Sequence, residues 1–246
     1  MPSTRSLLVA VALGAGALTT LSALPAGAAT SSAQSQVTAA LAAANSQKTV
    51  HYVATSTYST RSIVITGDVS ATEGQQQVVL HYGKNVGHMT NLLVGSAVYF
   101  KGDAYGLTAY LGLPSSLAPT YAGKWISVTS SSQGYSSIAQ SLTLSSAVDQ
   151  ISIKGPYKQS SVSTGGQKAT ALVGLTSSLS TGKKVGPATL FLTQATTPLP
   201  IRFVGIGHQS KGTAHGQVSY SNWNEPLNFT APTGAIPASS ISAAAG

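Results

Sequence analysis

The sequence predicts an α+β protein in which one antiparallel sheet packs against a few helices. Segments rich in Val, Ile, Thr and Tyr, with a period of two residues, occupy most of the chain. Their connections are too short for the crossovers that parallel strands need. Helix-spaced apolar residues occur near the start and in the middle. Of the 246 residues 42% are hydrophobic, enough for a core, and only 7% are charged, so 36 serines and 27 threonines supply much of the surface polarity.

The first residues have the pattern of a secretory signal peptide. Arg5 precedes an apolar run over 7–18, and small residues follow in the A-x-A pattern of a cleavage site. The run is shorter than the ~20 residues that span a membrane, which disfavours an uncleaved anchor. We expect residues 1–29 to be a signal peptide, cleaved near Ala28 or Ala29, and the mature protein to be secreted or extracytoplasmic.

The mature chain is predicted to begin with a helix and to continue into strands. Alanines and Val37 recur at helical spacing over 32–48. The period then changes to two, with turn residues such as Gly83-Lys84-Asn85 between apolar runs. The predicted strands are 50–58, 61–71, 75–82, 86–94 and 96–101.

A helical insert follows these strands. Asp103 is a good N-cap, and Leu107, Tyr110 and Leu111 share one helical face. Gly112 ends this helix. The remaining predictions for the middle of the chain are a short turn of helix over 115–121, a strand over 124–129 and a helix over 134–148.

The second half returns to strands and closes the domain. Glycine-containing turns separate Val-rich and Thr-rich runs. These runs are 150–162, 167–176, 187–196, 200–208 and 212–221, with a last extended piece at 226–231. No linker divides the chain, so we expect a single domain over 30–232. Residues 233–246 are rich in Ala, Ser and Pro, which predicts a flexible tail.

Charge and cysteine content narrow the partners. Thirteen basic residues against five acidic ones give a net charge of +8. The basic residues are scattered, whereas nucleic-acid-binding proteins gather them on one face. We therefore expect weak association with an anionic membrane or cell wall and no nucleic-acid partner. The absence of cysteine excludes disulfides, thiolate zinc sites and thiol catalysis.

Few residues could carry catalysis or hold a metal. The five acids fall mostly at turns or caps, which favours structural roles. His81 with His88, and His208 with His215, could meet across hairpins, but each pair would need a third ligand. The G-x-S-x-G elbow and the glycine motifs that bind phosphate are absent. We expect no enzymatic activity, no catalytic residues, no metal site and no cofactor; a hydrolase with an unrecognised triad remains an alternative.

Two stretches resemble a known family. One runs from Val98-Tyr99-Phe100-Lys101-Gly102-Asp103 through Leu111-Gly112-Leu113 to Tyr121-Ala122-Gly123-Lys124-Trp125-Ile126-Ser127-Val128, and the other is Tyr220-Ser221-Asn222-Trp223-Asn224-Glu225-Pro226 with Ala231-Pro232. They are similar to exported actinobacterial lipoproteins of the LppX/LprG type, within the broader LolA-like group. The two stretches cover about a fifth of the chain, and the order of elements extends the likeness over most of the rest.

The resemblance implies a curved antiparallel half-barrel whose concave face is covered by helices, with an apolar cavity between the layers that carries acylated lipids or lipoproteins. The predicted cavity-lining residues are Val98, Phe100, Leu107, Tyr110, Leu111, Leu113 and Leu117. The family has no catalytic residues to transfer. One departure is the lipobox: the sequence reads Ala26-Gly27-Ala28-Ala29 where members have a cysteine, so the protein is not expected to be lipid-anchored.

The sequence therefore predicts an exported, non-enzymatic binding protein that carries or senses a lipid or another hydrophobic molecule. The alternative is a secreted surface or cell-wall-associated protein with a filled core and no ligand, because a hydroxyl-rich surface of low charge fits both.

Overall fold

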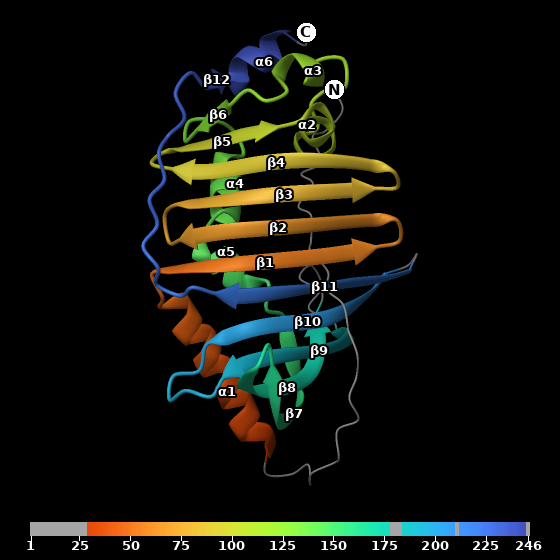
Figure 1. Ribbon diagram of the computed structural model, residues 1–246, viewed down its shortest axis with the longest axis vertical. Coiled ribbons are helices and arrows are strands. Elements are labelled where there is room, and N and C mark those ends of the chain that lie inside the picture. The colour runs from red at the N-terminus through yellow and green to blue at the C-terminus, as the bar shows by residue number, and fades with distance from the viewer. Residues whose placement is uncertain (1–28, 178–183, 210–211, 245–246) are drawn as a thin grey trace.

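A twelve-stranded sheet forms the body of the protein in a computed structural model that describes residues 29–177, 184–209 and 212–244 (Figure 1). The strand order is β12-β6-β5-β4-β3-β2-β1-β11-β10-β9-β8-β7. Neighbours are antiparallel except β12 and β6, which pair in parallel. The sheet is open, so the predicted α+β half-barrel class is confirmed.

The strands and helices have the following bounds. The strands are β1 Thr49–Tyr58, β2 Arg61–Ser70, β3 Gly74–Tyr82, β4 Asn85–Val94, β5 Ala97–Gly102, β6 Ile126–Thr129, β7 Ile153–Thr164, β8 Gln167–Ser177, β9 Lys184–Thr193, β10 Pro200–Gln209, β11 Gly212–Ser221 and β12 Ile236–Pro237. The helices are α1 Ala29–Asn45, α2 Ala104–Leu111, α3 Ala118–Tyr121, α4 Tyr135–Ser141, α5 Leu144–Asp149 and α6 Ala238–Ala244.

Pairing of the first strand with the last long strand unites the two halves of the chain. Strand β1 runs antiparallel to β11, from His51 opposite Ser221 to Tyr58 opposite Ala214. Strands β1–β6 and strands β7–β11 thus become one sheet, with short hairpins joining β1 to β5 in succession and α2 and α3 inserted between β5 and β6. This arrangement explains why a period of two residues continues on both sides of the helical insert.

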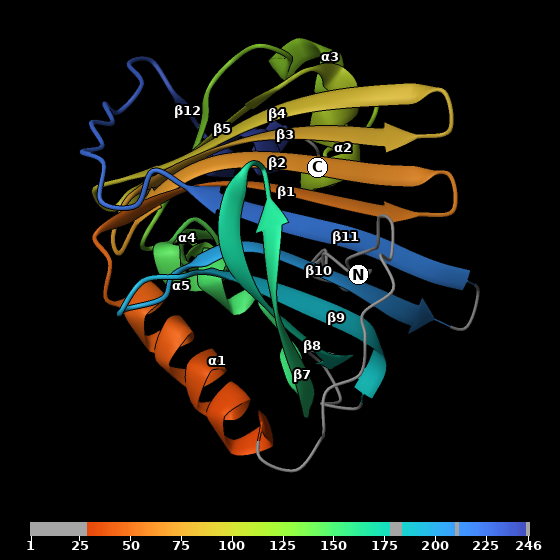
Figure 2. The same ribbon diagram turned by 60° about the horizontal axis from the view of Figure 1, so that its bottom comes forward.

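One face of the sheet holds most of the core. Alternate residues of β1 point to it, and Val50, Tyr52 and Ala54 are almost completely buried there. We call this the inner face. The sheet bends around it, and α4 and α5 lie inside the bend, with α1 along the lower half (Figure 2).

Three parts of the chain differ from the sequence-based expectation. The helix predicted over 134–148 is divided into α4 and α5, because serine and threonine hydroxyls compete with the helical hydrogen bonds. The hydroxyl of Ser141 donates to the carbonyl of Ile138 at 2.6 Å, and that of Thr143 donates to the carbonyl of Gln140 at 2.7 Å. The extended piece at 226–231 joins no ladder.

The C-terminal segment is the third difference, since 233–246 was expected to be a flexible tail. Ile236 pairs with Ile126 of β6, and its amide donates to the carbonyl of Trp125 at 2.8 Å. Ile241 of α6 is only 5% exposed. These two isoleucines supply the apolar burial that alanine and serine alone could not.

Candidate ligand-binding site

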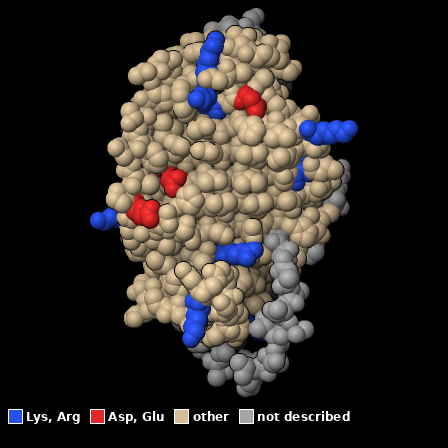
Figure 3. Space-filling view, in the orientation of Figure 1, with Lys and Arg blue, Asp and Glu red and all other residues tan. Residues whose placement is uncertain are grey.

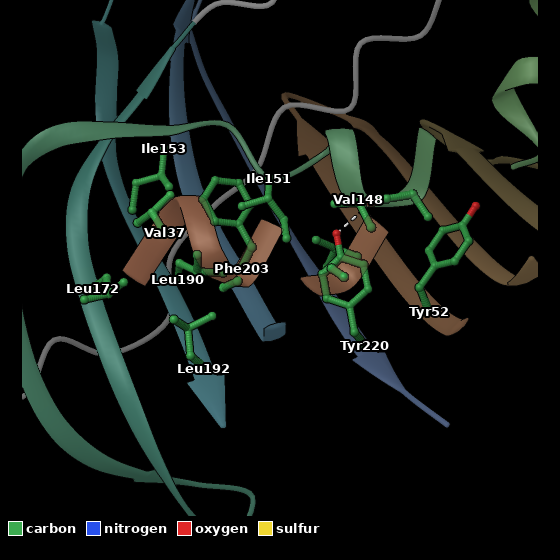
Figure 4. Packing of buried hydrophobic residues seen from close by; sticks show 14 of the residues in the cluster. Val37, Tyr52, Val148, Ile151, Ile153, Leu172, Leu190, Leu192, Phe203 and Tyr220 are labelled. Carbon is green, nitrogen blue, oxygen red and sulfur yellow. Dashed lines mark hydrogen bonds between the residues drawn. The ribbon is translucent and has the colours of Figure 1, made fainter. Parts of the chain in front are cut away.

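The core of the described residues divides into two clusters, which we name after the helix over each. The α1 cluster consists of Ala33, Val37, Ala40, Ala44, Val50, Tyr52, Ala54, Val69, Leu144, Ala147, Val148, Ile151, Ile153, Tyr157, Leu172, Ala188, Leu190, Leu192, Phe203, Val218 and Tyr220 (Figure 4). The α2 cluster consists of Ile63, Val78, Met89, Leu93, Val98, Phe100, Leu107, Ala118, Ile126, Leu142 and Ile241.

Six of the seven residues predicted to line a cavity belong to the α2 cluster or pack against it. Val98, Phe100 and Leu107 are buried in the cluster. Tyr110, Leu111 and Leu113 are partly buried and pack against it. Leu117 is half-buried at the start of α3. The chain thus brings the helical insert onto the inner face of β4 and β5.

Capping and a glycine hold α2 close to β4. Asp103 is the N-cap: one carboxylate oxygen accepts from the amide of Gly106 at 2.6 Å and the other from the amide of His88 at 2.9 Å. Gly87 allows the close approach, since an added Cβ would lie 2.8 Å from the Tyr105 ring. Gly112 ends the helix in the left-handed conformation, with φ of 72°. The predicted cap and stop are confirmed.

A row of buried polar side chains crosses the inner face between strands. Gln76 lies opposite Asn91 in the β3–β4 ladder. The Gln76 amide donates to the Tyr52 hydroxyl at 2.6 Å and to the Ser141 carbonyl at 3.0 Å. The Asn91 amide donates to the hydroxyl of Tyr110 at 3.0 Å. The row therefore connects α2 and the end of α4 to the sheet, which fixes where these helices sit.

Burial keeps the tyrosines near this row protonated. Removal from water raises the pKa of Tyr52 and of Tyr110, and hydrogen bonds from Gln76 and Asn91 oppose the rise only in part. The pKa of Tyr220 also rises through burial, and its hydroxyl donates to the Ala147 carbonyl at 2.7 Å. At neutral pH these phenols act as neutral hydrogen-bonding groups and not as bases.

The margin of the α2 cluster is rich in apolar side chains that water still reaches. The α1 cluster has few such neighbours: Leu41, Ile65, Leu199 and Trp223. The α2 cluster has many: Ile65, Leu80, Ala104, Tyr110, Leu111, Leu113, Tyr121, Val128, Tyr135, Ile138, Ala139, Ile236 and Ala238. We call the latter set the α2 margin. It is the largest partly exposed apolar region around either cluster.

Two hollows on the described surface are lined by none of the seven residues that the sequence predicts to line a cavity. The first, of about 410 Å³, lies between α1 and the β8–β9 edge and is lined by Ser35, Gln36, Ala39, Thr170, Leu192, Thr193, Gln194, Ala195, Thr196 and Pro198. The second, of about 280 Å³, lies where β5 passes into α2 and is lined by His88, Met89, Thr90, Lys101, Gly102, Asp103 and Gly123.

One pair of acidic and histidine side chains is in contact among the described residues. His51 Nδ1 lies 2.7 Å from an Asp68 carboxylate oxygen across β1 and β2, where both side chains are partly exposed. His81 lies opposite Val86 and not His88. Among the described residues, no group of three His, Cys, Asp or Glu side chains could hold a metal ion. None of the helices in the described ranges is long and apolar enough to cross a membrane.

Sequence reasoning missed the buried polar row, although the period-two pattern contains it. Gln76 and Asn91 sit at inward positions of segments already predicted as strands. An amide at an inward position of an otherwise apolar strand indicates a buried hydrogen bond. The partners on the helices require the structure, because Tyr110 and Ser141 are distant in the chain.

Comparison with known proteins places this architecture in a recognisable class. No family model matches the sequence, and no curated protein matches it. Among solved structures, LprF from Mycobacterium bovis matches with a TM-score of 0.52 and 17% identity, over 83% of this chain and 98% of that one. The Mycobacterium tuberculosis lipoprotein LppX matches with a TM-score of 0.50 and 16% identity, over 81% and 99%.

The fold is therefore that of the LppX type, and the resemblance found in the sequence is confirmed as a likeness of fold. LprF and LppX are the two solved proteins that carry this conclusion. At this level of identity the likeness defines the architecture, whereas function has to be argued from the site.

Proposed function

We propose that the protein is an exported, non-enzymatic carrier or sensor of a lipid or another hydrophobic molecule, which it binds at the α2 margin. The observation that carries the proposal is the concentration of partly exposed apolar side chains at that margin, over the inner face of the sheet. The LppX-type fold supports it, because the family resemblance implies a lipid carrier.

Burial of an acyl chain would supply the binding free energy. Each CH₂ removed from water contributes ~0.8 kcal/mol, and half-exposed leucines on the protein gain by being covered as well. Leu111 is the last residue of α2 and Leu113 follows its cap, and both pack partly buried against the α2 cluster, as Tyr121 of α3 does. A flexible chain can follow such a surface, whereas a rigid polar ligand would lose hydrogen bonds to water.

The ligand would reach this surface between short helices. Val98 and Leu107 are completely buried and offer no space of their own. Helices α2, α3, α4 and α6 each have eight residues or fewer. A short helix has a small area packed against the sheet, and much of its surface lies at a boundary with a neighbouring segment. Separation of two such helices costs less apolar contact than lifting a long helix from the sheet.

Native mass spectrometry tests the proposal directly. The mature protein, purified from its host without detergent, is expected to carry a co-purifying hydrophobic mass that organic solvent removes. The delipidated protein is expected to take up a fluorescent fatty-acid probe. A clean apo mass together with no uptake of the probe would contradict the proposal.

A filled-core surface protein without a ligand is the second candidate. The complete burial of Val98 and Leu107 favours it, because neither side chain has surface left for a ligand to cover. It predicts the contrary result in both measurements above, and it predicts binding of the protein to purified cell wall instead.

Export and domain extent form part of the same proposal. The leader and its cleavage near Ala28 or Ala29 fall on residues 1–29, of which 1–28 lie outside the described residues. N-terminal sequencing of protein recovered from culture medium is expected to begin at Ala29 or Thr30. Recovery of the uncleaved chain in the membrane fraction would contradict export as a free protein.

A further inference from the structure

The end of the sheet formed by the β1–β2 and β3–β4 hairpin turns has an unusual surface. Tyr82 is 46% exposed and Val86 is 42% exposed, and these are the only large apolar side chains counted as exposed among the described residues. Both belong to the β3–β4 hairpin. Single exposed apolar residues need no explanation, but two on one hairpin are typical of a surface that contacts a binding partner.

Basic side chains accompany these two residues. Arg61 of the neighbouring hairpin lies over the Tyr82 ring, with its Cζ atom 4.3 Å from the centroid. Its Nη2 atom donates to the Tyr82 hydroxyl at 3.2 Å. Lys84 is exposed in the β3–β4 turn. The segments 57–62 and 80–87 contain no Asp or Glu.

The apolar groups project from both faces of the hairpin. Arg61, Tyr82 and Asn85 lie opposite one another in register, so they share the inner face. His81 pairs with Val86 on the outer face. Because successive side chains alternate, the hairpin presents a tyrosine on one side, a valine on the other and Lys84 at its end.

Three of the acids lie away from these turns, whereas Asp103, which accepts from the amide of His88, lies closer to them. Asp68 and Glu73 lie at or near the β2–β3 turn, which is at the opposite end of the strands from the β1–β2 and β3–β4 turns. Glu225 and Lys48 are also found at that end. Figure 3 shows basic side chains projecting at the right edge, where Figure 1 places these turns; two groups of acidic atoms lie towards the left and a third lies near the top. The β1–β2 and β3–β4 turns themselves thus carry basic side chains and no acid of their own.

We propose that Arg61, Tyr82, Lys84 and Val86, which we call the tip patch, dock the protein onto an anionic phospholipid membrane. The inference rests on the proposed function, since a lipid carrier has to meet the membrane that supplies its ligand. Lysine and arginine pair with lipid phosphates, and tyrosine suits the boundary between headgroup and acyl chain. Valine can enter the same boundary without an unpaired polar group.

Vesicle sedimentation tests the tip patch with a matched control. The mature protein is mixed with phosphatidylcholine vesicles with and without phosphatidylglycerol, at fixed ionic strength. Each basic residue near an anionic surface accounts for about a fivefold change in partitioning, so the double variant R61Q/K84Q is expected to bind about 30-fold more weakly to the anionic vesicles. The control K154Q/K158Q removes two exposed lysines of β7 and changes net charge equally. It is expected to retain binding within about threefold.

The apolar part of the tip patch has its own variant. Y82S/V86S, which retains Arg61 and Lys84, is expected to weaken binding to anionic vesicles, because less apolar surface enters the membrane. Equal losses in R61Q/K84Q and K154Q/K158Q would assign the binding to net charge alone and overturn the proposal. Failure of the wild-type protein to prefer anionic vesicles would overturn it as well.

Probe uptake separates this proposal from the proposed function. All the tip-patch variants are expected to take up the fluorescent fatty acid from vesicle-free solution as the wild type does. Vesicle binding that depends on the tip patch, in a protein without probe uptake, would refute the carrier function and leave the docking surface intact. Probe uptake without vesicle binding would refute the docking surface only.

Discussion

The two ends of the inner face are covered in different ways. The long helix α1, together with the short helix α5, covers the α1 cluster, and α1 contributes small side chains such as Ala33, Ala40 and Ala44. The helix can then approach the sheet closely, and large sheet residues such as Phe203 fill the space. The α2 cluster is covered by several short helices, and many of its apolar neighbours remain partly exposed.

This difference in cover indicates where the fold can admit a ligand. A helix with small residues along its contact face leaves few gaps, because one continuous surface meets another. Short helices meet at several boundaries, and the side chains at each boundary are only half covered. The following changes test this contrast between an end with few partly exposed apolar side chains and an end with many, beginning with the largest effect.

Truncation of an apolar side chain should lower the free energy of unfolding more in the α1 cluster than at the α2 margin. Phe203→Ala is expected to lower the free energy of unfolding by about 3–5 kcal/mol, since the side chain is fully buried and its neighbours cannot collapse into the space. Leu80→Ala, at the α2 margin, is expected to cost less than about 2 kcal/mol, because water already reaches that side chain. Urea unfolding measures both. Equal costs would show that the two ends are packed alike.

Loss of the buried amide should loosen the helices over the sheet. Gln76→Leu leaves the Tyr52 hydroxyl and the Ser141 carbonyl without this donor, and we expect a loss of about 2–3 kcal/mol in the free energy of unfolding. The control is Gln77→Leu, an exposed neighbour on the opposite face, with an expected change within about 0.5 kcal/mol. A Gln76 variant as stable as this control would contradict the role of the polar row.

Removal of the α2 cap should act locally. Asp103→Ala is expected to cost about 1–2 kcal/mol, since the amides of Gly106 and His88 both lose their acceptor. Hydrogen exchange should accelerate in α2 and remain unchanged in α1. Uniform acceleration in both helices would mean that α2 does not open independently of the fold.

Alkaline pH should reveal the buried phenols with the smallest effect. The pKa of Tyr52 is raised by burial above its unfolded value near 10, so the unfolded state loses this proton first. The stability contribution is fully present below pH 10 and is lost as pH rises above it. Tyr52→Phe, followed by thermal unfolding between pH 8 and 11, is expected to flatten the decline. An unchanged slope would show that Tyr52 is not buried as described.

The sequence predicts the strands well because alternation is a local property. The long strands β1–β4 lie within two residues of the predicted ranges at each end, and the N-cap at Asp103 and the stop at Gly112 are confirmed. The pairing of β1 with β11 joins residues about 160 positions apart, and no local pattern encodes it. The same holds for the contact of Asn91 with Tyr110, and for the packing of Ile241 that makes the C-terminal segment part of the core.

Local chemistry also explains the error in the helix over 134–148. Apolar spacing at Ile138 and Leu142 predicts one helix, but hydroxyls at Ser141 and Thr143 bond to the preceding turn and interrupt it. The predicted cavity residues were chosen for apolar character, which does not separate a filled core position such as Leu107 from a margin position such as Leu111.

Uptake of the fluorescent fatty-acid probe by two tryptophan variants tests whether the ligand binds at the α2 margin. Leu111→Trp fills the α2 margin, and Leu41→Trp makes the same change at a partly buried site beside the α1 cluster. Each should cost ~1–3 kcal/mol of stability through overpacking. Our account predicts that Leu111→Trp lowers probe affinity at least tenfold while Leu41→Trp leaves it unchanged. Equal affinities in the two variants would contradict binding at the α2 margin.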